Sequence, residues 1–222
     1  MDRGRRTFAL GRACLLAAAI GSGWTAPAAA QLMVQGFLGN SFSVPSPLKL
    51  VQSGYPDLTF TAHYSTRPFE PTWYYAWRLG YFWGRTGLLL DFVHHKVYLE
   101  NPPPEVQDFR ITYGYNIFTL GPAWKTRHTV YNLGVGAVVG NPHSIVRGQE
   151  WTRHGGIFNG GYYLAGPALQ GGASWSFRVV NRFFLSLDGR LTAAYARVPI
   201  EGGHANVPNL ALHVLLGAGY GF

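Results

Sequence analysis

The sequence has few charged residues and no long apolar segment. Only 13% of its 222 residues are charged, which is about half the share of an ordinary soluble domain. No segment after residue 31 contains the roughly 18 uninterrupted apolar residues that a membrane-spanning helix requires, and mean hydropathy is only +0.02. Together these deficits exclude a helical membrane protein. They are typical of a transmembrane β-barrel, whose strands alternate lipid-facing apolar residues with small or polar lumenal ones.

Cysteine is also nearly missing. The one cysteine of the chain, Cys14, lies within a segment that we predict to be a cleavable signal peptide, residues 1–30. Four arginines, Arg3, Arg5, Arg6 and Arg12, precede the apolar run 13–20, and the small residues Ala28-Ala29-Ala30 form a cleavage site before Gln31. The expected mature chain, residues 31–222, then contains no thiol, which excludes disulfides, thiolate nucleophiles and cysteine-bound metals.

The mature chain has 14 basic and 9 acidic residues after four arginines and Asp2 are removed. This modest positive excess suits an anionic surface, and we expect no nucleic-acid partner for an exported chain. What the chain does contain is aromatic and glycine residues: aromatics make up 15%, and there are 29 glycines.

Segments of alternating or apolar-aromatic character recur along the mature chain, each bounded by turn residues. Eight strands are predicted, at 32–43, 72–83, 88–98, 115–125, 130–140, 162–177, 183–195 and 209–222. In the sixth, we expect Ala165, Leu169 and Trp175 to face lipid while Gln170 and Ser174 face the lumen. The seventh alternates in the same way, and its inward positions include Asp188 and Arg190, which we expect to form an ion pair inside the barrel.

Short and long connections alternate along this series. Links at 84–87, 126–129 and 178–182 are short, whereas those at 44–71, 99–114, 141–161 and 196–208 are long. Outer-membrane barrels have short periplasmic turns and long external loops, so the pattern predicts an all-β fold, an eight-stranded antiparallel transmembrane β-barrel of the outer-membrane type with long external loops. Residues 58–64 also have strand character, and we interpret them as a loop hairpin rather than a ninth strand.

An eight-stranded barrel is filled by its own side chains, so a porin is not expected. Seven aromatic residues near strand ends are interpreted as interfacial girdle residues: Tyr74, Tyr75, Trp77, Tyr81, Phe82, Trp83 and Trp124. The chain ends in the aromatic Phe222, as outer-membrane barrels commonly do, and the barrel-assembly machinery is the partner expected to recognise it.

The densest polar cluster in any predicted strand runs from Asp91 to Tyr98 and includes His94, His95 and Lys96. By parity Asp91 and His95 share one face, and His94 and Lys96 share the other. If Asp91 is lumenal, His94 and Lys96 point outward at headgroup level, where Lys96 could bind a lipid phosphate. The simplest alternative is that all are interfacial polar residues of the rim.

His143, which follows Asn141-Pro142, supplies a second candidate. The adjacent Ser144 suggests a hydrolytic dyad with Glu150 or Asp91 as the orienting residue, but neighbouring residues of an extended chain point to opposite faces. Imidazole and carboxylate groups also suit divalent metals such as iron or manganese. A metal site made by His94 or His95 with His143 and Asp91 is therefore a further hypothesis.

Four short motifs, in this order and spacing, resemble outer-membrane barrels related to rhizobial lipid A oxidase. They are Phe92-Val-His94-His95-Lys96-Val97-Tyr98, Tyr113-Gly114-Tyr-Asn116-Ile117, Gly134-Val-Gly136 leading to Pro142-His143, and Tyr163-Leu-Ala-Gly166-Pro167-Ala168. The similarity extends from about residue 72 to the carboxyl terminus. It implies oxidation of the proximal glucosamine of lipid A to 2-aminogluconate by molecular oxygen, in the outer leaflet of the outer membrane of a Gram-negative bacterium.

The resemblance places His94, Lys96, Asn116, Pro142 and His143 on matching positions. We expect His94, His143 and Asn116 to be catalytic, and Lys96 and His95 to bind substrate. Oxygen reacts slowly with closed-shell sugars, so a divalent metal, iron or manganese, is the expected cofactor, with His94, His143 and Asp91 as ligands.

The expected partners are outer-membrane lipid and lipid A, and the chain is expected to be a monomer. Two other functions remain open at this stage: a noncatalytic barrel that acts as an anchor, adhesin or envelope-stability protein, and a lipid A deacylase. His95 and the first loop depart from the family pattern, which leaves the substrate open.

Overall fold

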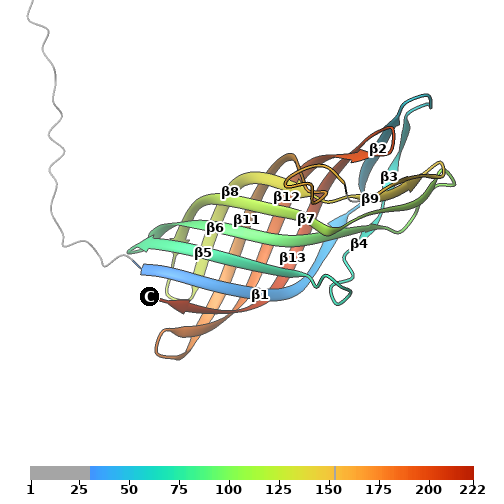
Figure 1. Ribbon diagram of the computed structural model, residues 1–222. Coiled ribbons are helices and arrows are strands. Elements are labelled where there is room, and N and C mark those ends of the chain that lie inside the picture. The colour runs from blue at the N-terminus through green and yellow to red at the C-terminus, as the bar shows by residue number, and fades with distance from the viewer. Residues whose placement is uncertain (1–30, 153) are drawn as a thin grey trace, which may run out of the picture.

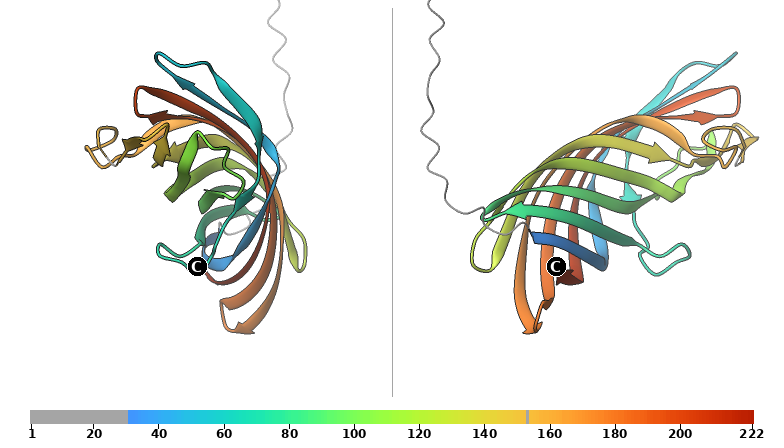
Figure 2. Two further views of the ribbon diagram at one scale, coloured as in Figure 1. Left: turned by 90° about the vertical axis from the view of Figure 1, so that its right-hand side faces the viewer. Right: turned by 60° about the vertical axis from the view of Figure 1, so that its left-hand side comes forward.

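The computed structural model describes residues 31–152 and 154–222, so the predicted signal peptide, residues 1–30, lies outside the described residues. Within the described ranges every regular element is a β-strand, and no helix there has the length and apolar character needed to cross a membrane. Figures 1 and 2 show a tilted barrel that is prolonged at one end by strands reaching beyond its rim.

Eight strands close the barrel in the order β1, β5, β6, β7, β8, β11, β12, β13 and back to β1, and every pairing is antiparallel. Their bounds are β1 Gln31–Val44, β5 Tyr75–Trp83, β6 Thr86–Leu99, β7 Val106–Lys125, β8 Thr129–Gly140, β11 Tyr163–Val180, β12 Phe183–Ile200 and β13 Gly203–Gly221. All eight predicted strands are thus confirmed. The chain forms the eight-stranded antiparallel transmembrane β-barrel of the outer-membrane type that the sequence predicts.

Five short strands extend the external end: β2 Ser46–Gln52, β3 Leu58–Ala62, β4 Tyr64–Ser65, β9 His143–Val146 and β10 Gln149–Trp151. The β2–β3 hairpin pairs with the outer end of β13, which confirms that residues 58–64 do not add a ninth strand to the barrel wall. The β9–β10 hairpin pairs with the outer end of β7 in the same way.

Two expected long loops are wrong in extent. Strands β12 and β13 remain paired as far as Ile200 and Gly203, so the connection predicted at 196–208 is a two-residue turn at the tip of a long hairpin. Similarly β7 begins at Val106, well inside the link predicted at 99–114. The polar backbone of these protruding strands is satisfied by β2 and β9, which lets the sheet continue past the membrane level.

Sidedness follows strand parity. Leu169 and Trp175 are 57% and 51% exposed, whereas Gln170 and Ser174 are 4% and 2% exposed. Ala165 is an exception: a bulge between Leu164 and Gly166 shifts the register, so Leu164 faces outward and Ala165 is buried. Parity alone could not locate this bulge.

Exposed aromatics encircle both ends of the wall, as expected for interfacial girdles. At the short-turn end they are Tyr81, Trp83, Trp124, Tyr131, Trp175 and Tyr220, and at the other end Trp73, Tyr75, Tyr113 and Tyr195. The prediction that Tyr74 and Phe82 belong to the girdles is wrong, because each is 1% exposed and points inward. Phe222 is exposed beside Tyr220, so its side chain is on the outer surface, and its recognition by assembly machinery stays a prediction.

The lumen is filled in three layers. An apolar cluster near the short turns includes Met33, Phe82 and Leu89, and a larger apolar cluster fills the external half. Between them lies a polar layer that contains Arg78, Asp91, Asp188 and Arg190, each at most 1% exposed. The middle and the external half of the lumen are therefore a packed core, as the strand number predicts, whereas the short-turn end is partly hollow.

Candidate functional site at the external end

The polar segment of β6 crosses from the middle of the barrel to its external rim. Asp91 and His95 point into the lumen, as parity predicts, and a bulge between His95 and Val97 interrupts the pairing with β7. His94 has the outward parity, yet only 4% of its surface is exposed because residues before β5 cover it.

Asp91 belongs to the buried ion network. Its Oδ1 lies 2.7 Å from Arg78 Nε and 3.1 Å from Arg190 Nη1, and Arg78 Nη1 donates to Asp188 Oδ2 over 3.0 Å. Arg190 Nε also donates to Asp188, which confirms the predicted Asp188–Arg190 pair. Gln170 Nε2 donates to Asp91 Oδ2 over 2.9 Å, so both carboxylate oxygens are occupied by protein donors.

His95 is fully buried in the lumen. Its Nδ1 lies 3.1 Å from Ser41 Oγ, and its Nε2 lies 3.1 Å from Asn209 Oδ1. Both ring nitrogens therefore have partners inside the core. Its position is that of a core histidine, and substrate binding by His95 stays an untested prediction.

His94 and Asn116 face each other across the β6–β7 pair. His94 Nδ1 lies 2.7 Å from Asn116 Oδ1, and a carboxamide oxygen accepts, so Nδ1 carries the proton in the neutral ring. The other nitrogen, Nε2, lies 3.1 Å from Thr72 Oγ1, whose hydroxyl also donates to Thr112 O over 3.3 Å, so the Thr72 proton is shared between these two acceptors. Tyr75 stacks on the imidazole with ring centroids 5.0 Å apart. Two of the residues that the resemblance places on matching positions, His94 and Asn116, are thus in contact, and Thr72 lies beside them.

Asn116 depends on a glycine for its position. Gly114 has φ +128°, and a Cβ built on it would lie 2.1 Å from both terminal atoms of the Asn116 carboxamide. Gly114 O also accepts from Asn141 N over 3.0 Å, which links this site to the start of the loop after β8. Gly114 therefore provides the space in which the Asn116 carboxamide lies.

Lys96 is turned away from the lipid. Its Nζ donates to Arg67 O over 3.0 Å and to Glu70 O over 2.9 Å, and none of its surface is exposed. The expectation that Lys96 points to headgroups is therefore corrected, because its ammonium is used to hold the segment 67–74 against the barrel. This segment also carries Thr72, so Lys96 acts on the site through the loop.

His143 lies in the protruding β9 strand, opposite Arg110, and Arg110 in turn pairs with Tyr98. Tyr98 is four residues beyond His94, so His143 is displaced by about 13 Å along the strand direction. His143 Nε2 lies 3.3 Å from Asp108 Oδ2. Ser144 is fully buried, while His143 is half-buried on the other face, so their side chains diverge as strand parity predicts. His143 and His94 do not form one site.

The predicted metal ligands do not fit a metal centre. Across residues 31–152 and 154–222, no group of three His, Cys, Asp or Glu side chains is arranged to hold a metal ion. His94 is bound to Asn116 and Thr72, His143 to Asp108, and Asp91 to arginines in the lumen. The ligand set His94, His143 and Asp91 is thus not assembled, and iron or manganese as cofactor stays an untested prediction.

A groove on the lipid-facing wall lies beside His94. It has a volume of about 820 Å³, and its lining includes Gly36 and Gly39 of β1, Tyr75 and Trp77 of β5, and Phe69. Gly36 leaves open space on this face of the wall, because a Cβ built on it would have no atom within 4 Å. Phe69, which is 85% exposed, projects from the loop that covers His94. Tyr75 both lines the groove and stacks on His94.

Sequence reasoning missed Thr72, Tyr75 and this groove. Thr72 carries no motif, and its contact with His94 depends on how the loop before β5 folds back. Strand parity could have found Tyr75, because residues Tyr75 and His94 lie directly opposite each other.

No family model matches the chain, and no curated protein matches it. Solved structures that match this chain include the following three. Ail, the attachment invasion locus protein of Yersinia pestis, is 16% identical, with 87% of this chain and 98% of Ail covered and a TM-score of 0.42. The outer membrane protein OprG from Pseudomonas aeruginosa is 12% identical, with 88% and 97% covered and a TM-score of 0.46. The outer membrane protease OmpT from Escherichia coli is 8% identical, with 86% and 97% covered and a TM-score of 0.39. Likenesses at this level carry no information on activity.

Proposed function

We propose that the protein modifies lipid A in the outer leaflet of the outer membrane, with His94 as general base, and that the reaction is oxidation of the proximal glucosamine to 2-aminogluconate. One observation carries the proposal. The His94 imidazole is held by Asn116, directs Nε2 toward the exposed loop residue Thr72, and lies at an aromatic girdle beside a lipid-facing groove. Such a position brings a base to the level of lipid headgroups.

The groove supports an acylated substrate. Its lining is almost entirely apolar, and Tyr75 connects it to His94. An acyl chain that lies along Gly36 and Gly39 would bring the sugar headgroup of its lipid to the rim, next to Thr72 and His94. Lipid A combines acyl chains with a sugar headgroup in the leaflet that this end of the barrel faces.

The chemistry that the chain itself supplies is proton transfer. Asn116 Oδ1 accepts a hydrogen bond from Nδ1–H, so Nε2 carries the lone pair that can take a proton from a hydroxyl group. In oxidation, that hydroxyl is the one on the anomeric carbon of the sugar. The carbon loses two electrons, molecular oxygen accepts them with two protons to give hydrogen peroxide, and water opens the resulting lactone to the acid. Asn116 orients the base, and the aromatic side chains around it exclude water.

Deacylation is the second candidate, and one specific observation favours it. Thr72 Oγ1, His94 and Asn116 form a hydroxyl–imidazole–carboxamide series, the order of nucleophile, base and orienting group in acyl hydrolases. In that reaction His94 takes the Thr72 proton as the oxygen attacks an acyl ester. The displaced alcohol takes that proton, and water later releases the fatty acid.

Mass spectrometry of lipid A tests both reactions. Lipid A is compared from cells of a Gram-negative host with and without the protein. Oxidation adds the mass of one oxygen atom, deacylation removes an acyl chain, and a noncatalytic anchor or adhesin leaves the spectrum unchanged, which would overturn the proposal.

The matched variants are His94→Ala and, as control, His63→Ala, an exposed histidine of the same external loop region. The modification is expected to disappear in the first and persist in the second. Thr72→Val then separates the reactions, because deacylation requires the Thr72 hydroxyl as nucleophile and oxidation does not. His143→Ala, which sequence reasoning predicted to be inactive, is expected to retain the modification.

A further inference from the structure

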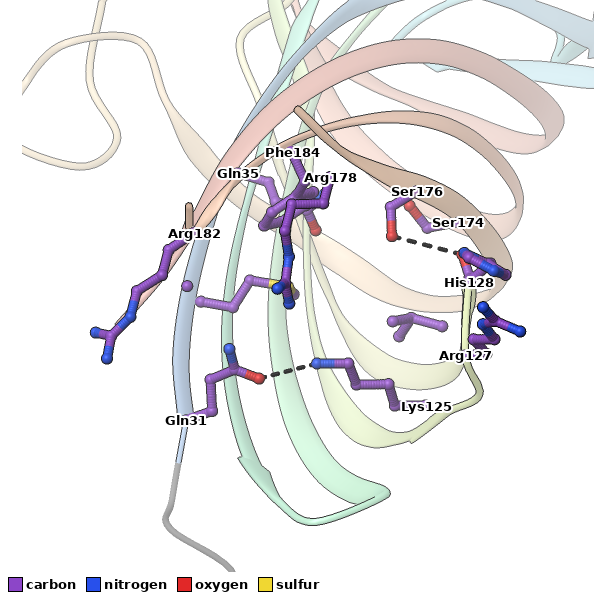
Figure 3. A pocket seen from close by; sticks show the side chains of 13 residues that line it. Gln31, Gln35, Lys125, Arg127, His128, Ser174, Ser176, Arg178, Arg182 and Phe184 are labelled. Atoms are coloured by element: carbon purple, nitrogen blue, oxygen red, sulfur yellow. Dashed lines mark hydrogen bonds between the residues drawn. The ribbon is translucent and has the colours of Figure 1, made fainter. Parts of the chain in front are cut away.

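The short-turn end of the barrel opens into a cavity of about 470 Å³, shown in Figure 3. Its rim is formed by the ends of β7, β8, β11 and β12 together with the start of β1. Four cationic side chains belong to its lining, Lys125, Arg127, Arg178 and Arg182, and His128 lies among them. None of the thirteen lining residues is acidic. We refer to this cavity as the basic vestibule.

The basic vestibule reflects a separation of charge along the barrel axis. Of the nine acidic residues in the described part of the chain, Asp91 and Asp188 lie in the middle of the lumen, and the other seven lie in the external loops and strand extensions. They are Asp57, Glu70, Glu100, Glu105, Asp108, Glu150 and Glu201. Among residues 31–152 and 154–222, no acidic side chain therefore lies at the short-turn end to neutralise the basic vestibule.

Its guanidinium groups are without protein partners. In the residues that the structure describes, the side chains of Arg127, Arg178 and Arg182 form no ion pair and no hydrogen bond, and Lys125 Nζ donates only to Gln31 Oε1 over 2.8 Å. Figure 3 shows Arg178 in the centre, with Arg182 on one side and Arg127 and His128 on the other. Like charges gathered around one cavity repel each other, and an anion placed among them relieves that repulsion.

We propose that the basic vestibule binds a phosphate-bearing anion. A phosphate group presents more acceptor oxygens and more charge than a carboxylate, and guanidinium groups bind it bidentately. Gln35, Ser174 and Ser176 add neutral polar groups to the lining, while Met33, Val130 and Phe184 form an apolar wall for the body of the ligand. This inference is independent of the site at His94.

Two sources could supply the phosphate. The basic vestibule lies at the level of the short-turn girdle that includes Trp124, Tyr131 and Trp175, where headgroups of the periplasmic leaflet are found. An anionic phospholipid could therefore reach it from the rim. A soluble phosphate ester could enter from the periplasm.

The first arm of the test uses soluble probes. Folded protein in a maltoside detergent is titrated calorimetrically with sodium pyrophosphate and with sodium acetate at constant ionic strength. Wild-type protein is expected to bind pyrophosphate more tightly than acetate, and Arg178→Gln or Arg127→Gln is expected to weaken binding by about tenfold, the value of one charge-assisted hydrogen bond. Arg85→Gln is the matched control, because Arg85 lies in a short turn at the same end but outside the basic vestibule.

The second arm uses lipids. The same variants are reconstituted in phosphatidylcholine bilayers that contain phosphatidylglycerol, and the lipids retained are counted by native mass spectrometry. Retention of phosphatidylglycerol that falls in Arg178→Gln and not in Arg85→Gln identifies a lipid headgroup, whereas pyrophosphate binding alone identifies a soluble phosphate. Binding in neither arm, equal loss in Arg85→Gln, or equal affinity for acetate overturns the proposal. The heat-dependent gel mobility of the folded barrel confirms that each variant is folded, and two independent arginines keep the test decisive if one variant fails.

Discussion

Asn116 Oδ1 lies 2.7 Å from His94 Nδ1, across a pair of neighbouring strands in which the two residues are directly opposite. This contact sets which ring nitrogen faces Thr72, and therefore which one can accept a proton at the membrane surface. It is the relationship on which the proposed reactions at the external end depend.

Asn116→Ala removes the acceptor of the Nδ1 proton. We expect it to lower the rate of lipid A modification by at least about tenfold, since a well-placed general base contributes about 10²- to 10⁴-fold. Asn116→Asp keeps an acceptor oxygen at this position and is expected to restore part of the rate. Time courses of lipid A mass spectra measure both. An unchanged rate in Asn116→Ala would show that the orientation of His94 does not matter.

Gly114→Ala tests the contact between His94 and Asn116 by removing the space in which the Asn116 carboxamide lies. The added methyl group would lie 2.1 Å from the Asn116 carboxamide on a backbone with φ +128°, so Asn116 must move. We expect a loss of about 1–3 kcal/mol in unfolding free energy together with reduced modification. Gly189→Ala is the control, because a Cβ at that position of β12 has no atom within 4 Å. Urea unfolding in lipid vesicles compares the two variants.

Asp91→Ala leaves Arg78 and Arg190 without one of their two carboxylate partners in the buried network. Removing one partner of a buried ion pair costs about 3–5 kcal/mol, and we expect a loss of that size in the same urea assay. Asp57→Ala breaks the ion pair with Lys49, in which the side chains of Lys49 and Asp57 are 44% and 49% exposed. We expect this change to lower the unfolding free energy by at most about 1 kcal/mol. Equal losses in both variants would contradict the structural importance of the lumenal network.

Lys96→Met keeps the length of the side chain and removes its ammonium. The carbonyl groups of Arg67 and Glu70 then lose their donor, so the segment 67–74 should open more often. Hydrogen exchange should become faster at the amides of Glu70 and Tyr74, which are bonded within this segment. Exchange at these amides should be unchanged in Lys49→Met. Slow exchange in Lys96→Met would mean that other contacts hold the loop.

Glu100 provides a test of pH dependence outside the membrane. The hydrogen bond from Ser65, together with the guanidinium of Arg67, lowers the pKa of the Glu100 carboxyl below its ordinary value of 4.5. A depressed folded-state pKa means that this contribution to stability is present above the unfolded pKa and is lost as the pH falls through the folded one. Carbon NMR of the Glu100 carboxyl should show its midpoint below 4.5, and Ser65→Ala should raise it.

The barrel itself could be predicted because its wall obeys a period of two over eight long segments. Leu169, Gln170, Asp188 and Arg190 all face the side that parity assigns them. Ala165 does not, because one extra residue at a bulge reverses parity locally, and no composition signal marks it. The alternation of apolar residues also predicts strands β7, β12 and β13 that are too short. Their outer ends are not apolar, and pairing with β2 and β9 stabilises them.

The candidate site could be predicted only in part. His94 and Asn116 meet because strand register brings them together, which a pattern of motifs can indicate. Lys96 has outward parity like His94, but a loop folds over both residues, and the Lys96 ammonium donates to the loop carbonyl group of Arg67. His143 lies at the external end, as the sequence predicts, but farther out along the strands than His94. The reason is that residues 141 onward leave the barrel wall and pair with the outer part of β7. Such tertiary departures from the wall are invisible to parity.

The filled lumen has an electrical consequence. Two apolar layers enclose a layer in which Arg78, Asp91, Asp188 and Arg190 bind one another, so an ion that entered would have to displace both hydrocarbon and paired charges. This layer separates the site at His94 from the basic vestibule, so a ligand bound at one end of the barrel does not reach the other end through the lumen.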